Sequence, residues 1–107
     1  MQKVTSIAEL NQIIEANAMV LVYFSGKNCG VCSVLKPRVN ELLDNYPNIK
    51  KLEVEIETSM EISAQFNIFS IPAILLFIDG KEAIREIRHL SLLDLENKIA
   101  RYYQLYD

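Results

Sequence analysis

Apolar residues along this chain fall into short strand-like runs separated by stretches with helical spacing. The runs at 19–24 and 73–78 are continuous and rich in β-branched and aromatic residues, which is typical of strands buried on both faces. Apolar and acidic residues alternate over 51–57, which predicts a strand with one buried and one wet face. Asp79-Gly80 favours a tight hairpin turn, so we expect a further strand over 82–88.

Four other stretches have the apolar spacing of amphipathic helices. Ser6 and Glu9 have the form of a capping box at the start of the first stretch, and Ser59 and Ser91 are N-cap candidates for two later ones. Pro37 lies inside the longest stretch and is expected to kink it. The predicted helices cover about 7–17, 29–46, 59–66 and 91–104.

The predicted order of elements is β-α-β-α-β-α-β-β-α. Strands that alternate with helices favour parallel pairing, with helices on both faces of the sheet. The last two strands are expected to form an antiparallel hairpin instead. We therefore predict an α/β fold, a three-layer α/β/α sandwich with a mixed central sheet, and a single domain over residues 1–107.

Composition and charge limit the function. The chain has 107 residues, of which 50% are hydrophobic and 23% charged, and its formal net charge is -3. These values are those of an ordinary globular protein, and they argue against a nucleic-acid partner. No apolar run reaches the roughly 20 residues of a membrane span, and the first residues lack the apolar segment of a signal peptide. We expect a cytoplasmic monomer without cofactor or metal.

The candidate chemistry is concentrated in two cysteines, Cys29 and Cys32, where a predicted strand, a loop and a helix meet. Residues three positions apart share one helical face, within the separation that a disulfide spans. Cys29 would meet the free N–H groups and the positive end of the helix dipole, which favour a thiolate. Cys32 would lie a turn deeper. We interpret Cys29 as the attacking nucleophile and Cys32 as the resolving thiol.

Two other interpretations of these cysteines stay open on the sequence. They could be ordinary core residues, although a pair at such a junction is an uncommon coincidence. They could also bind zinc, but a structural zinc site needs about four ligands. The chain offers these two cysteines and one histidine, His89, so a complete site would have to be shared between two chains.

Several segments together resemble the thioredoxin family. The matching features are, in chain order, the strand at 21–24, the motif Cys29-Gly30-Val31-Cys32, the helix proline Pro37, Ile71-Pro72 with the apolar strand after it, and the Asp79-Gly80 turn. The resemblance covers nearly the whole chain and implies the thioredoxin fold. It also implies thiol–disulfide exchange with disulfide-containing protein substrates, and a thioredoxin reductase as a possible partner.

The resemblance further implies a substrate groove. In the family, the proline that corresponds to Pro72 follows a cis peptide bond and lies against the cysteines. The backbone before that proline, here Ile71, holds a substrate strand by hydrogen bonds. The alternative is an ordinary trans proline at the start of a strand. The residues expected to bind substrate are Gly30, Val31, Ile71, Pro72 and Arg88.

The sequence departs from the family pattern around this groove. Ser25 and Asn28 stand where tryptophans are usual. Arg88, followed by His89, stands where the family has a glycine. A long cationic side chain at that position is expected to narrow the groove and to add positive charge.

A second departure concerns the proton of the resolving cysteine. The family's buried aspartate corresponds to Tyr23, and its lysine partner corresponds to Glu53. Tyrosine is a poor base near neutral pH, so Glu53 is a candidate for proton transfer with Cys32. The alternation favours the other interpretation, in which Glu53 joins Glu55 and Glu57 on a wet strand face.

Two functions of different classes follow. The intact cysteine pair favours an enzyme, a thiol–disulfide oxidoreductase in which Cys29 attacks and Cys32 resolves. The missing tryptophans and the occupied glycine position favour a thioredoxin-like redox-sensing or partner-binding module with little turnover. The fold alone does not separate the two.

Overall fold

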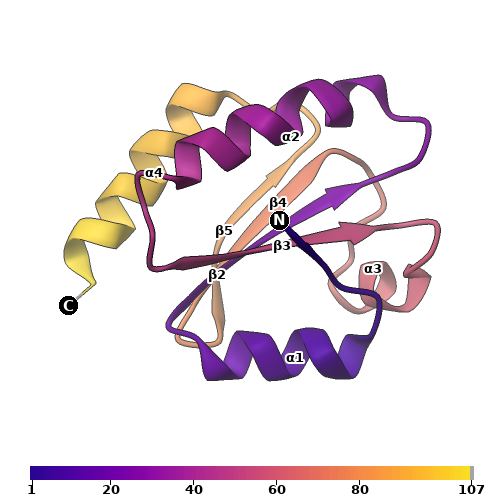
Figure 1. The fold of residues 1–107 in the computed structure, drawn as a ribbon, viewed down its shortest axis with the longest axis horizontal. Helices are drawn as coiled ribbons and strands as arrows, with labels where there is room; N and C mark the ends of the chain where they lie inside the picture. The colour runs from indigo at the N-terminus through magenta and orange to yellow at the C-terminus, as the bar shows by residue number, and fades with distance from the viewer. Residues whose placement is uncertain (107) are drawn as a thin grey trace.

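A computed structural model describes residues 1–106 as one mixed β-sheet with helices on both faces (Figure 1). The strands are β1 (Gln2–Lys3), β2 (Met19–Ser25), β3 (Ile49–Glu55), β4 (Ala73–Ile78) and β5 (Lys81–Ile87). The helices are α1 (Ile7–Ala16), α2 (Gly30–Leu43), α3 (Met60–Gln65) and α4 (Leu92–Leu105). Helices α1 and α3 cover one face of the sheet, and α2 and α4 cover the other. The predicted element order and three-layer arrangement are confirmed.

The strands lie in the order β1-β3-β2-β4-β5, with β2 at the centre. β2 pairs in parallel with β3 and antiparallel with β4, so the sheet is mixed as predicted. β4 and β5 form the expected antiparallel hairpin. At its turn Asp79 and Gly80 have φ angles of 51° and 82°, which aspartate and glycine adopt more readily than most residues.

Strand β2 carries two hydrophobic cores, one on each face of the sheet. Val20, Val22 and Phe24 belong to the core shared with α1 and α3. Met19, Leu21 and Tyr23 belong to the core shared with α2 and α4. Because both faces of β2 are buried, the strand needs apolar residues at every position, which explains its continuous apolar run.

Strand β3 starts and ends two residues earlier than the predicted range of 51–57. The N–H of Thr58 donates to the carbonyl of Glu55 at 3.2 Å, and this turn ends the strand before Glu57. The short strand β1 was not assigned to any residues from the sequence. It pairs Lys3 with Glu53 of β3, and two residues are too few to show a period of their own.

Helix α2 is three residues shorter at its end than the predicted range of 29–46. The N–H of Asp44 donates to the carbonyl of Glu41 at 3.1 Å and that of Asn45 to the carbonyl of Leu42 at 3.2 Å, and such a tightened last turn satisfies carbonyls that the helix leaves open. Pro37 lies inside this helix, as the sequence predicted. Within residues 1–106, no helix combines the length and the apolar content needed to cross a membrane.

Three strand ends meet at one edge of the sheet, and this edge positions the cysteines. β2 ends there and leads into the loop before Cys29, β4 begins there, and β5 ends there. Ala73, the first residue of β4, pairs with Phe24 on one side and with Ile87 on the other. The loop before Cys29, the segment up to Pro72 and the residues after Ile87 are therefore neighbours in space.

Candidate active site

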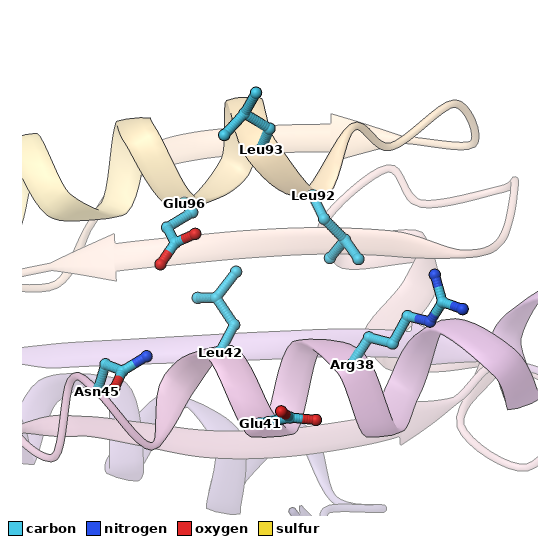
Figure 2. A pocket seen from close by; sticks show the side chains of 7 residues that line it. All are labelled: Arg38, Glu41, Leu42, Asn45, Leu92, Leu93 and Glu96. Atoms are coloured by element: carbon cyan, nitrogen blue, oxygen red, sulfur yellow. The ribbon is translucent and has the colours of Figure 1, made fainter.

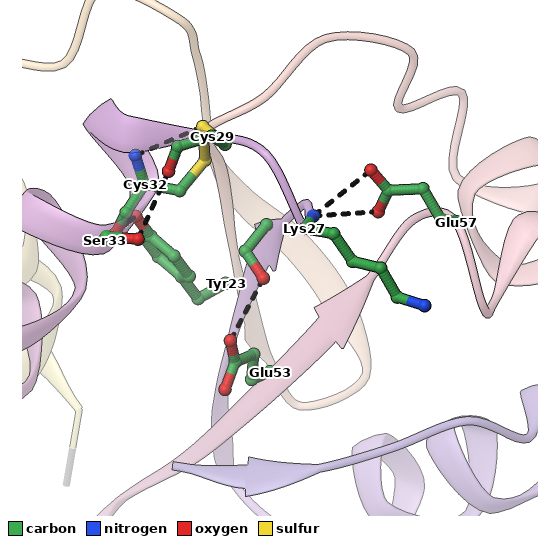
Figure 3. Close-up of a disulfide and its surroundings, with 8 residues drawn as sticks. Tyr23, Lys27, Cys29, Cys32, Ser33, Glu53 and Glu57 are labelled. Atoms are coloured by element: carbon green, nitrogen blue, oxygen red, sulfur yellow. Dashed lines mark hydrogen bonds between the residues drawn. A yellow bond between two sulfur atoms is a disulfide. The ribbon is translucent and has the colours of Figure 1, made fainter.

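Cys29 and Cys32 form a disulfide at the start of α2, with their Cα atoms 5.2 Å apart. Cys29 is the N-cap residue of the helix, and its sulfur accepts a hydrogen bond from the N–H of Cys32 at 3.2 Å (Figure 3). Cys32 is 3% exposed, whereas Cys29 is only half-buried. The outer sulfur is therefore the one that meets both solvent and the helix N-terminus, as the sequence predicted. In residues 1–106 no three potential metal ligands are grouped.

Tyr23 of β2 contacts the first turn of this helix through a hydrogen bond. Its hydroxyl, on the fully buried ring, donates to the carbonyl oxygen of Cys32 at 2.9 Å. Burial, and then the negative charge of Glu53, raise the pKa of Tyr23 to about 12. The phenol therefore keeps its proton at neutral pH and positions the helix start rather than acting as a base.

Glu53 lies in the interior, so its assignment to a wet strand face was wrong. The residue is 6% exposed and accepts hydrogen bonds from Ser25 Oγ and Lys36 Nζ, both at 3.0 Å (Figure 3 for Ser25). β1 pairs with β3 at this residue, and Lys36 of α2 reaches it from the helix layer. Glu55 is half-buried and Glu57 is exposed, so the three glutamates of the alternating segment have different environments.

Glu53 and the inner cysteine both line a polar cavity of about 280 Å³. Its lining residues are Lys3, Ser25, Gly26, Lys27, Cys32, Ser33, Lys36, Glu53 and Glu55. A polar cavity of this size has room for several water molecules. Cys32 and the buried carboxylate of Glu53 thus line the same polar space.

The loop that carries the cysteines is held by Glu57, a contact that the sequence did not reveal. The N–H of Lys27 donates to the two carboxylate oxygens of Glu57 at 3.3 and 3.2 Å (Figure 3). Gly26 allows this approach, because a Cβ atom there would lie 2.5 Å from Ile71 Cδ1 and 3.0 Å from Glu57 Oε2. The glycine between a strand and the motif was the available signal for this close contact.

The segment predicted to bind substrate lies beside this loop. The Ile71–Pro72 peptide bond is cis, as the resemblance implied. The carbonyl of Pro72 accepts the N–H of Arg88 at 2.8 Å, so the end of β5 is fixed against the proline. Arg88 has a φ of 70° and an exposed side chain. The structure thus brings the cysteines, Pro72 and Arg88 to one edge of the sheet.

A separate groove of about 450 Å³ runs between α2 and α4 (Figure 2). Leu42 and Arg38 of α2 lie across it from Glu96 and Leu92 of α4. The residues that line this groove include no cysteine and no histidine. It therefore adds no group to the disulfide chemistry.

Comparison with known proteins agrees with this geometry. Residues 2–101 match the family model described as Thioredoxin. The Thioredoxin-like protein YdfQ of Bacillus subtilis is 34% identical over 102 residues, which cover 95% of this chain and 91% of that protein. The thioredoxin of Mycoplasmoides gallisepticum is 34% identical over 96 residues, covering 90% of this chain and 96% of that protein.

Solved structures show the same fold. The thioredoxin of Fasciola hepatica superposes with a TM-score of 0.86 at 25% identity, covering 94% of this chain and 98% of that one. The oxidised thioredoxin of Plasmodium falciparum superposes with a TM-score of 0.79 at 22% identity, covering 97% and 95%. With a family match over nearly its whole length and a disulfide capping the helix after its central strand, the chain belongs to the thioredoxin family.

Proposed function

We propose that this protein is a thiol–disulfide oxidoreductase that exchanges its cysteine pair with disulfides of protein substrates. The observation that carries this proposal is the position of Cys29 at the N-cap of α2, where its sulfur accepts the N–H of Cys32. The same N–H stabilises a thiolate at this atom, and it does so where the sulfur can meet a substrate.

The reaction runs in two balanced steps from the reduced protein. The Cys29 thiolate attacks one sulfur of a substrate disulfide, forms a mixed disulfide and releases the first substrate thiolate, which takes up a proton. Cys32 then loses its proton and attacks the Cys29 sulfur, which releases the second substrate thiol and leaves the Cys29–Cys32 disulfide. Two electrons pass to the substrate, and an external dithiol donor, here proposed to be a thioredoxin reductase, returns them.

Glu53 is the proposed proton acceptor for Cys32. It lines the same polar cavity as the inner cysteine, and its carboxylate is held by Ser25 and Lys36. These two contacts fix the position of the carboxylate at the cavity. In this proposal a buried carboxylate on β3 accepts the proton. Tyr23 on β2 cannot serve as the base because its pKa is about 12.

The proposed substrate groove is formed by Gly30, Val31, Ile71, Pro72 and Arg88. Val31 is 64% exposed beside the disulfide, which suits it to contact a bound partner. The backbone of Ile71 would pair with an extended substrate segment, as strand addition does in other peptide complexes. In this proposal the chain acts as one monomeric domain in the cytoplasm and needs no cofactor.

Reduction of insulin by dithiothreitol tests this function. The wild-type protein is expected to accelerate the reaction well above the rate with dithiothreitol alone, and Cys29→Ser is expected to remove the acceleration. An acceleration that survives Cys29→Ser would contradict the proposal. Adding a thioredoxin reductase with NADPH in place of dithiothreitol then tests the electron donor.

The second candidate is a redox-sensing or partner-binding module, and Arg88 is the observation that favours it. Its backbone is bound to Pro72 and its side chain is exposed. In this proposal, the long side chain at a position where the family has a glycine restricts access to Pro72 and favours one tightly bound partner over many substrates. The two functions differ in turnover. An oxidoreductase oxidises many equivalents of its donor per protein molecule, whereas a switch consumes one equivalent and stops.

A further inference from the structure

We infer that Arg88 selects substrates whose disulfide is flanked by acidic side chains, and that its backbone is held in an unfavourable conformation to place it there. This inference rests on the proposed function, because it names the substrate class of the same groove. It is carried by the backbone of Arg88, by its place in the fold and by its charge.

The backbone conformation of Arg88 is unusual for its residue type. Besides glycine, three residues in 1–106 have a positive φ: Asn67 at 57°, Asp79 at 51° and Arg88 at 70°. Asparagine and aspartate adopt this region several times more often than other residues, whereas a long side chain is disfavoured there. A glycine would fit position 88 without strain. Residues in such conformations cluster at functional sites.

Three hydrogen bonds keep the chain in this conformation. The N–H of Arg88 donates to Pro72 at 2.8 Å, the N–H of His89 to Ile87 at 3.0 Å and the N–H of Leu90 to Arg88 at 3.1 Å. The backbone of Arg88 is therefore held by the end of β5 and by the carbonyl of Pro72. It lies at the sheet edge where β2 leads to Cys29.

The charge of Arg88 has no partner among residues 1–106. No carboxylate in this part of the chain lies within 4.0 Å of its guanidinium, and the side chain is exposed. Arg85, three residues earlier, is by contrast bound by the carboxylate of Glu82 and the carbonyl of Phe66. Glu57, the acidic side chain at the cysteine loop, already accepts the N–H of Lys27.

The guanidinium group of Arg88 indicates a carboxylate as its ligand. Its planar set of N–H donors matches a carboxylate by two parallel hydrogen bonds, which an ammonium group cannot make. Val31, which lies between the two cysteines, is 64% exposed and offers apolar contact only. Arg88 therefore presents an exposed cation at the end of the sheet that leads to Cys29, and an extended segment with Glu or Asp next to its cysteine complements it.

Three disulfide peptides that differ only in the residues next to cysteine, Glu, Gln or Lys, test the inference. For the reduced wild-type protein we expect the Glu peptide to react about threefold to tenfold faster than the Lys peptide at low salt. The ratio should fall toward one in Arg88→Gln and in 0.5 M NaCl, and Arg88→Lys should retain part of it. An unchanged ratio in Arg88→Gln would overturn the inference.

The strain in the backbone of Arg88 is tested separately, by thermal unfolding. Arg88→Gly is expected to raise Tm by about 4 °C, because glycine removes the strain of the left-handed conformation, while it abolishes the charge preference. Asn67→Gly is the matched control: it changes another positive-φ residue, and it is expected to leave exchange with all three peptides unchanged. A Tm for Arg88→Gly at or below that of the wild type would show that Arg88 is not strained.

The same assay separates this inference from the proposed function. Exchange of the wild-type protein with the Gln peptide reports the proposed function alone. Exchange with all three peptides at one rate would overturn only the role of Arg88. Exchange with none of them would contradict the proposed function and the inference with it.

Discussion

The backbone N–H of Cys32 donates a hydrogen bond to the sulfur of Cys29 at 3.2 Å, so the inner cysteine helps to stabilise the outer one. Cys29 is half-buried and Cys32 is 3% exposed, which adds a difference in access. In the reduced protein we expect iodoacetamide to alkylate Cys29 at least about tenfold faster than Cys32. Peptide mapping after short labelling times measures both rates. In denaturant the two rates should become equal, and a faster Cys32 in the folded protein would reverse the assigned roles.

Glu53→Gln tests the proton transfer. Starting from a mixed disulfide on Cys29, release of the second thiol should be slower by about tenfold or more at pH 7, because Cys32 loses its positioned base. The variant's release should then rise with pH, as solvent takes the proton instead. Stopped-flow measurement of thiol release between pH 6 and 8 gives both values. Release that matches the wild type over this range would remove Glu53 from the mechanism.

Tyr23→Phe tests the contrasting role of the buried tyrosine. The loss of its hydrogen bond to the Cys32 carbonyl should lower the free energy of unfolding by about 1 kcal/mol, with little change in the pH dependence of exchange below pH 9. Chemical denaturation and rate profiles check the two parts. Tyr102→Phe, at an exposed hydroxyl, is the control.

The raised pKa of Tyr23 also gives a pH dependence of stability. The unfolded chain releases the phenol proton near the ordinary value of 10, whereas the folded protein holds it up to about 12. The contribution is therefore fully present below pH 10 and is lost as pH rises from 10 through 12. Tyr23→Phe should show a smaller decline of unfolding free energy in this window than the wild type. An equal decline in both proteins would place the titration elsewhere.

Gly26→Ala and Gly30→Ala form a matched pair of substitutions on either side of Cys29, one in the loop before it and one at the start of α2. A Cβ at Gly26 would lie 2.5 Å from Ile71 Cδ1, so this alanine should cost about 1–3 kcal/mol and disturb the residue before Pro72. A Cβ at Gly30 meets nothing within 4 Å, and alanine at this helix position should be neutral or stabilising. Urea denaturation of both variants provides the comparison. Equal stabilities would show that the loop has room at Gly26.

The sequence predicted the fold well where one pattern had one structural solution. The continuous apolar run of β2 fits only a strand buried on both faces, and Asp79-Gly80 fits a tight hairpin. The two cysteines at a strand–helix junction could be placed at an N-cap because few positions in a chain combine a strand end with a helix start. These inferences depend on local sequence alone.

The environments of Glu53, Glu57 and Arg88 depend on contacts with residues far away in the sequence. Glu53 has the same alternating context as Glu55, and only pairing with β1 and contact with Lys36 bury it. The hydrogen bond of Glu57 to the cysteine loop joins segments 30 positions apart. Arg88 combines a positive φ with a hydrogen bond to the carbonyl of Pro72, 16 positions earlier in the chain. Such contacts arise from tertiary packing, so residue pattern could not separate them from ordinary surface charge.

The most direct test of the central claim is to trap the reaction halfway. Cys32→Ser, reduced and mixed with a disulfide substrate, should accumulate a mixed disulfide on Cys29, whereas Cys29→Ser should form little or none with Cys32. Intact-mass spectrometry followed by peptide mapping identifies the bonded cysteine. A substrate adduct on Cys29 in the first variant alone is the result that this account predicts. An adduct on Cys32 in the second variant at a comparable rate, or no adduct in either, would contradict it.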